Sequence, residues 1–98
     1  MWIGWIEFDL LLGDIHSLKA KRGTVRPLVA ELRRRFSVAA AEVGEQDLHR
    51  RAVVGASVVA GTSAHIIEVL DEVERFVADR PEFVLLSARR RLLDADDV

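Results

Sequence analysis

The alternation of apolar and polar residues at the start of the chain constrains the fold more than any other feature. Residues 2–12 alternate with a period of two, which is typical of a β-strand. The face predicted to point into the core carries Trp2, Gly4, Ile6, Phe8, Leu10 and Leu12. After a turn at residues 13–14, the apolar residues recur with helical spacing from Leu18 to Phe36. This change of period predicts a strand followed by a helix.

The predicted first helix contains two residues that disfavour a helix, Gly23 and Pro27. Proline lacks the N–H that would bond the carbonyl of residue 23. A helix that begins just after Gly23 would instead place Pro27 in its tolerant first turn. Because Leu18 keeps the phase of the later apolar residues, we predict one helix over residues 17–36, with Ser17 as its N-cap.

The rest of the chain shows the same two periods. Strands are predicted over residues 37–43, 49–60 and 83–92, with Val84, Leu86 and Ala88 pointing inward in the last one. An amphipathic helix with an N-cap at residues 61–63 and a stop at residues 79–81 precedes that strand. The order βαββαβ predicts an α+β, ferredoxin-like fold. Its four-stranded antiparallel sheet would carry both helices on one face and the first and third strands at the centre.

Composition limits the class of protein further. The length of 98 residues suits one domain, which we place at residues 1–93, followed by a frayed acidic tail at residues 94–98. The chain has no cysteine, which excludes disulfides and agrees with a cytoplasmic location. The apolar start is not a signal peptide, because Glu7 and Asp9 interrupt it. No stretch approaches the roughly 20 apolar residues of a membrane span.

Charge is distributed unevenly along the chain, although the net charge is only −2. Residues 16–36 contain seven basic residues and one acidic residue, whereas residues 62–82 contain six acidic and two basic ones. Several of the cations lie at the predicted start of the first helix, where the helix dipole disfavours positive charge. A bound oxyanion such as a phosphate would remove this conflict. The candidate anion- or RNA-binding residues are His16, Ser17, Lys19, Lys21, Arg22 and Arg26. The alternative is a solvated helix start that the acidic second helix neutralises.

The sheet face away from the helices is predicted to be more apolar than a water-facing sheet needs. It would hold Ile3, Trp5, Val53, Phe83 and Leu85. Aromatic residues on such a face can stack RNA bases, but the third strand contributes no aromatic residue to it. We therefore expect a protein contact there, most simply a homodimer.

Acidic residues form a polar loop between the second and third strands. The loop contains Glu42, Glu45, Gln46 and Asp47, followed by His49. These side chains could form a metal site or a carboxylate pair, or they could pair with Arg50, Arg51 or Lys19. A hairpin loop buries little surface, and hard metals need several converging oxygens, so we expect no metal and no cofactor. We also expect no catalysis, because no third group orients His16 towards Ser17.

Several segments carry a resemblance to a known family. These are SLKxKR at residues 17–22, residues 33–36, AEVGEQDL at 41–48, residues 51–53 and residues 80–81. Together they resemble the YlxP-like family of small bacterial proteins, formerly a domain of unknown function. The resemblance covers nearly the whole chain and implies a ferredoxin-like fold but no established activity. Family members are often encoded near translation and ribosome-maturation factors, which implies a ribosome-related role by association only. His49, Arg50 and Pro27 depart from the residues that the resemblance implies.

These observations together predict a non-enzymatic accessory protein. We expect it to bind an RNA or ribonucleoprotein surface, such as ribosomal RNA or a ribosomal particle, through its basic helix start. We expect no DNA and no membrane among its partners. The alternative is a module that binds a protein or a second copy of itself through the open face of the sheet.

Overall fold

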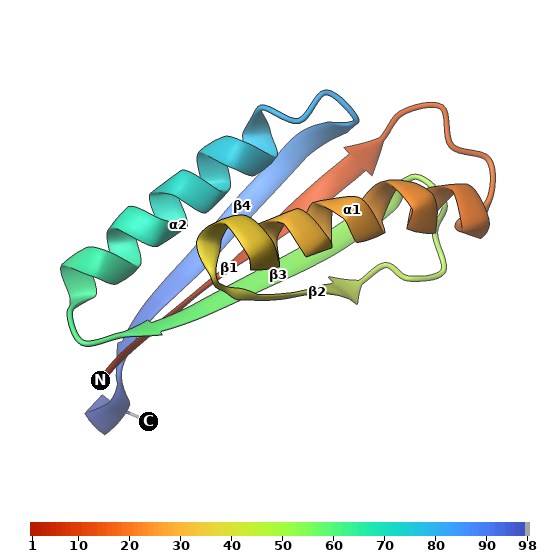
Figure 1. Cartoon of the computed structure of the whole chain (residues 1–98). Helices are drawn as coiled ribbons and strands as arrows, with labels where there is room; N and C mark the ends of the chain where they lie inside the picture. The colour runs from red at the N-terminus through yellow and green to blue at the C-terminus, as the bar shows by residue number, and fades with distance from the viewer. Residues whose placement is uncertain (98) are drawn as a thin grey trace.

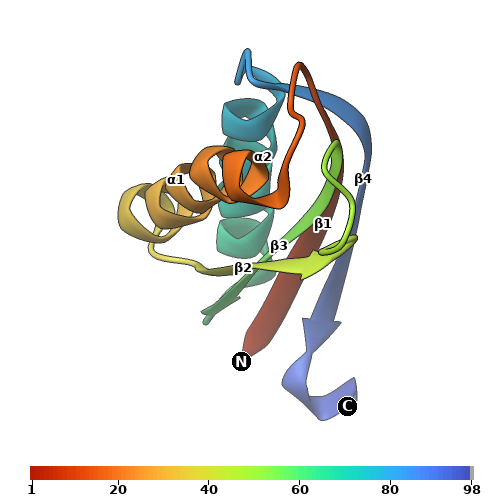
Figure 2. The ribbon, with the colours of Figure 1, turned by 90° about the vertical axis from the view of Figure 1, so that its right-hand side faces the viewer.

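The computed structural model describes residues 1–97 and contains one four-stranded antiparallel sheet and two helices. In chain order the elements are β1 (Trp2–Leu12), α1 (Leu18–Phe36), β2 (Ala39–Gly44), β3 (Arg51–Ala60), α2 (Ser63–Ala78) and β4 (Phe83–Asp94). The strand order is β2-β3-β1-β4, so β1 and β3 are central. Both helices cover the same face of the sheet (Figures 1 and 2). The predicted ferredoxin-like α+β fold is confirmed.

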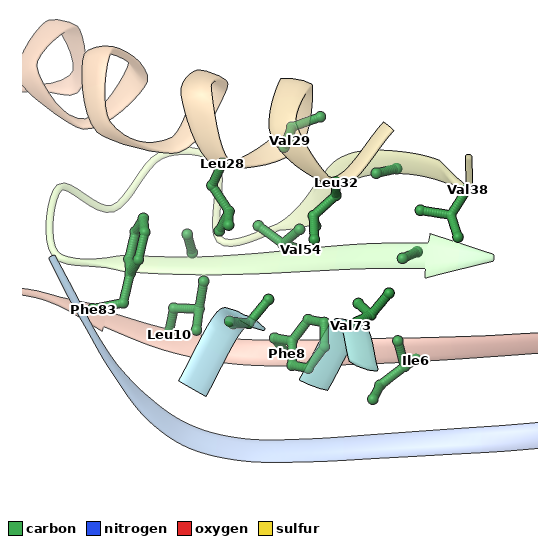
Figure 3. Packing of buried hydrophobic residues seen from close by; sticks show 14 of the residues in the cluster. Ile6, Phe8, Leu10, Leu28, Val29, Leu32, Val38, Val54, Val73 and Phe83 are labelled. Carbon is green, nitrogen blue, oxygen red and sulfur yellow. The ribbon is translucent and has the colours of Figure 1, made fainter. Parts of the chain in front are cut away.

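The core lies between the sheet and the two helices, as the alternation in β1 predicted. Ile6, Phe8, Leu10 and Leu12 are each fully buried, and their intervening neighbours are not. Figure 3 shows Ile6, Phe8 and Leu10 facing apolar residues of α1 and α2, which include Leu28, Leu32 and Val73. The same face of β3 contributes Ala52, Val54 and Ala56 to this core.

Helix α1 is continuous from Leu18 to Phe36 and has Ser17 as its N-cap, so both predictions are confirmed. The Ser17 side chain accepts a hydrogen bond from the backbone N–H of Ala20 at 3.0 Å. Gly23 and Pro27 lie on the exposed side of the helix. Water can therefore bind the carbonyl of Gly23 that Pro27 leaves free, which makes the proline tolerable there.

The predicted faces of β4 are wrong in its first half because the strand contains a β-bulge. The register pairs Asp9 with Ser87 but Leu10 with Leu85, so Leu86 is an extra residue. An extra residue inverts the alternation of side chains on one side of it. Phe83 is consequently buried, 6% exposed, on the helix-covered face.

The bulge reverses the predicted face of every residue of β4 that precedes it. Leu85, like Phe83, packs against the core, whereas Val84 and Leu86 are 57% and 46% exposed. Beyond the bulge the predicted phase holds, and Ala88 pairs with Phe8 on the helix-covered side. Phe83 and Leu85 therefore do not belong to the open face of the sheet.

The end of the chain also differs from the prediction. Strand β4 continues to Asp94, two residues further than predicted, and Ala95–Asp97 form a short 3-10 helix. The backbone N–H of Ala95 donates to the carbonyl of Met1 at 2.9 Å, which joins the two ends of the chain. Val98, the last residue of the predicted tail, lies outside the described residues.

Candidate nucleic-acid interface

The basic residues divide into those with partners inside the molecule and those without. Carboxylates pair with Lys21, Arg51, Arg80, Arg89 and Arg90. Backbone carbonyls accept hydrogen bonds from Arg33 and Arg50, and Arg35 stacks on the ring of Phe76. Within residues 1–97 the remaining cations have no such side-chain partner; they are Lys19, Arg22, Arg26, Arg34, Arg75 and Arg91. Four of these belong to α1.

The four unpartnered cations of α1 share one side of the helix. Successive residues rotate by about 100°, so positions 19, 22, 26 and 34 lie within one third of the circumference. All four residues are exposed. At about 1.5 Å per residue, the row is roughly 22 Å long. We call Lys19, Arg22, Arg26 and Arg34 the α1 basic face.

Lys21 does not belong to this surface, although it was a candidate anion-binding residue. It is 1% exposed and its Nζ lies 2.9 Å from the Glu42 carboxylate of β2. Its ammonium also donates a hydrogen bond to the backbone carbonyl of Glu45. Two of the segments that carry the family resemblance, residues 17–22 and 41–48, are therefore joined through this ion pair.

Two other candidates at the helix start already have local partners. The imidazole of His16 lies 2.6 Å from the carboxylate of Asp14 in an exposed pair. The Ser17 hydroxyl is the helix cap. Three of the six candidates therefore have partners within the chain. The three that remain free to contact a ligand are Lys19, Arg22 and Arg26.

The start of α1, the end of β2 and the β2–β3 connection line a partly open polar cavity of about 410 Å³. Its lining comprises Leu18, Lys21, Arg22, Arg26, Glu42, Gln46 and Asp47. Glu42 Oε2 is buried and makes no hydrogen bond, so its contact with Lys21 is an ion pair of poor hydrogen-bond angle. Arg22 and Arg26 thus line the cavity together with the carboxylates of Glu42 and Asp47, so its wall carries charges of both signs.

The sequence suggested that the acidic residues of the β2–β3 loop pair with Arg50, Arg51 or Lys19, and the structure shows other ion pairs. Glu42 pairs with Lys21, whereas Arg51 pairs with Asp9 at 2.6 Å and Arg50 binds backbone carbonyls. Hydrogen bonds to Asp9 raise the pKa of Arg51 above its usual value. Glu45 adopts a left-handed conformation with φ 58°, which turns the chain after β2.

No group of three or more potential metal ligands is found among the residues that the structure describes. The side chain of Gln46 donates to the carbonyl of Glu42 at 3.4 Å, and Asp47 is exposed. The expectation of no metal stays a prediction.

The acidic residues of α2 do not neutralise the α1 basic face. Asp71 and Glu74 pair with Arg90 of β4 at 2.8 and 2.9 Å. Burial lowers the pKa of Arg90, but hydrogen bonds to Glu74 and Asp71 outweigh it and raise the pKa above the usual value. Glu31 of α1 pairs at 2.8 Å with Arg80, which follows the end of α2.

Arg34 is a functional candidate that the sequence interpretation missed. The helix dipole favours cations in the last turn of a helix, which is by itself a sufficient reason for the run Arg33–Arg35. In the structure Arg33 donates twice to the carbonyl of Ala40 on the edge strand β2, at 3.0 and 2.7 Å, and Arg35 lies 4.7 Å from the Phe76 ring centroid. Helical spacing alone would not have singled out Arg34, because Arg33 is closer in phase to Arg26; the contacts of Arg33 and Arg35 leave Arg34 as the member of the run without a partner among the described residues.

The fold and this surface define the class of the protein as a small ferredoxin-like domain with a basic helix. A family model described as "Protein of unknown function (DUF503)" matches residues 3–90, so the chain belongs to that family. The chain is also 29% identical over 80 residues to "Uncharacterized protein YlxP" of Bacillus subtilis (strain 168), covering 82% of this chain and 87% of that protein. These findings confirm the YlxP-like resemblance. Neither of the two described helices is both long and apolar enough to cross a membrane.

Proposed function

We propose that this protein is a non-enzymatic accessory factor that binds RNA or a ribonucleoprotein through the α1 basic face. The observation that carries the proposal is the row of Lys19, Arg22, Arg26 and Arg34, none of which has an acidic partner within residues 1–97. Most other arginines of the molecule are held by carboxylates, carbonyls or a ring.

Phosphates are the ligands that best suit such a row. Exposed lysine and arginine side chains neutralise backbone phosphates and release counterions, which supplies sequence-independent affinity. A row of roughly 22 Å spans several phosphates of a nucleic-acid strand. The shape of RNA is recognised in this way when bases are not read directly.

The sheet is a poor site for reading bases, although domains of this topology often use it. Strand β3 offers Val53, Gly55, Ser57 and Val59 on its open face, and none is aromatic. Base stacking requires aromatic or arginine planes at the centre of the sheet. We therefore assign RNA contact to α1. Following the association implied by the family, we propose ribosomal RNA or a ribosomal particle in the cytoplasm as the partner.

A salt titration with matched variants tests this proposal. Arg22→Gln/Arg26→Gln should weaken binding to structured RNA and reduce the slope of log K against log salt. The expected reduction is about 0.7–0.9 for each lost phosphate contact, or up to about 1.8 for both. The unfolding midpoint should stay unchanged, because neither arginine has a partner among the described residues.

The control removes the same charge from other surfaces. Arg75→Gln/Arg91→Gln also deletes two exposed, unpartnered arginines, but these lie on α2 and β4. This control should bind with the wild-type slope. The proposal fails if both double variants lose affinity equally, or if the α1 variant keeps the wild-type affinity and slope.

A further inference from the structure

The polar cavity beside the start of α1 adjoins the α1 basic face. Arg22 and Arg26 belong to that face and also line the cavity, whose volume is about 410 Å³. Pockets that hold small ligands usually measure about 300–1,000 Å³, so the cavity has room for one base with its ribose. An RNA strand that places its phosphates on Arg22 and Arg26 therefore passes the opening of the cavity.

Hydrogen-bond acceptors of the cavity come from the end of β2 and the loop that follows it. The Glu42 side chain is 21% exposed although its Oε2 is buried against Lys21 Nζ, so Oε1 is the carboxylate oxygen that can accept a hydrogen bond from a ligand. The carboxylate of Asp47 is exposed and has no partner within residues 1–97. Gln46 donates its amide N–H to the carbonyl of Glu42 at 3.4 Å, which leaves its side-chain oxygen as an acceptor.

These acceptors favour a base whose edge presents hydrogen-bond donors. An ionised carboxylate can only accept, so it leaves an acceptor on a base without a partner. Guanine presents an imino N–H and an amino group side by side, whereas adenine and cytosine present only an amino group and uracil only an imino N–H. Guanine therefore matches the cavity best, and Leu18 adds an apolar surface for the face of the base. Unpaired RNA bases are read through their Watson–Crick edges in this way.

We propose that the cavity binds one unpaired guanosine of the RNA, whose Watson–Crick edge donates hydrogen bonds to Glu42, Gln46 and Asp47. The phosphates on either side of this nucleotide contact Arg22 and Arg26. The guanosine site rests on the proposed function and adds base selection to it. Phosphate contacts carry no sequence information by themselves, so the α1 basic face supplies affinity for any RNA and the cavity selects the base.

Fluorescence anisotropy with RNA hairpins that share one stem tests the guanosine site. The loop consists of uridines, and in three further hairpins one loop uridine is replaced by guanosine, adenosine or cytidine. The wild type should bind the guanosine hairpin at least about tenfold more tightly than the others, the discrimination expected of one good pair of hydrogen bonds. Gln46→Ala/Asp47→Ala should reduce this preference to less than about twofold. The variant should keep the wild-type unfolding midpoint, because both side chains are exposed.

Two controls separate base selection from the effect of charge. Glu45→Gln changes an exposed acidic residue of the same loop that does not line the cavity, so it should keep the guanosine preference. Lys19→Gln/Arg34→Gln removes cations of the α1 basic face that lie outside the cavity. This variant should weaken binding of every hairpin by a similar factor and leave the preference unchanged.

The outcomes distinguish the guanosine site from the proposed function. Equal affinity of the wild type for all of the hairpins, or a preference that survives Gln46→Ala/Asp47→Ala, overturns the guanosine site and leaves RNA binding by the α1 basic face intact. If no hairpin binds, the proposed function fails as well. Guanosine monophosphate should compete far more weakly than the guanosine hairpin, because it reaches only part of the basic face. If it competes as strongly, the cavity holds a free nucleotide, which overturns the assignment to RNA.

Discussion

Lys21→Met should lower the free energy of unfolding by about 2–4 kcal/mol, because it leaves the buried carboxylate of Glu42 without its cation. The Lys21 and Glu42 side chains are 2% and 21% exposed, so solvent screens the pair only in part. The variant also removes the hydrogen bond to the carbonyl of Glu45. Urea denaturation followed by circular dichroism measures the loss.

Two comparisons make this test specific. Lys19→Met changes an exposed lysine two residues away and should alter stability by less than about 0.5 kcal/mol. Lys21→Met/Glu42→Leu should recover much of the loss, since an apolar pair can replace a buried ion pair. Folded Lys21→Met should bind RNA as the wild type does, because Lys21 is not on the surface. If Lys21→Met unfolds at the same urea concentration as Lys19→Met, the Lys21–Glu42 pair does not stabilise the fold.

Gly4→Ala should destabilise the protein by about 1–3 kcal/mol through overpacking. Gly4 is buried on β1 where α2 crosses, and a Cβ atom there would lie 2.2 Å from Ile66 Cγ2 and 3.2 Å from Leu70 Cδ1. Ile66 is fully buried and branched at Cβ, so it cannot turn aside freely. Thermal and urea unfolding measure the effect.

Replacing a glycine that faces open space should have the opposite effect on stability. Gly23 lies in the interior of α1, and nothing lies within 4 Å of an added Cβ. Gly23→Ala should therefore stabilise the protein by about 0.5–1 kcal/mol, the usual helix preference for alanine. Adding Ile66→Ala to Gly4→Ala should restore part of the space and show coupling between the two sites. Equal effects of the two glycine changes would contradict the packing argument.

The fold was predictable because its periodic signals are strong and local. The alternation in β1 and the helical spacing of α1 each reflect one buried face, and burial is what the structure shows. The bulge at Leu86 was not predictable, since the two sides of the strand have similar apolar residues. One inserted residue was enough to exchange the faces of Phe83 and Leu85.

The candidate site was predictable only in part. Lys21 lies four residues before Val25 and seven before Leu28, in phase with the buried side of α1, so its burial had a signal in the sequence. Glu42 likewise shares a face of β2 with the buried Ala40. Which cations remain free could not be predicted. Pairs such as Glu7 with Arg89 depend on strand register and join residues far apart in the chain.

Co-sedimentation of the protein with ribosomal particles on sucrose gradients tests the central claim most directly. The wild type and Arg75→Gln/Arg91→Gln should migrate with the particles at low salt and leave them as salt rises. Arg22→Gln/Arg26→Gln, equally folded, should stay at the top of the gradient. If the wild type stays at the top at every salt concentration, or the α1 variant migrates with the particles as the wild type does, the α1 basic face does not bind a ribonucleoprotein.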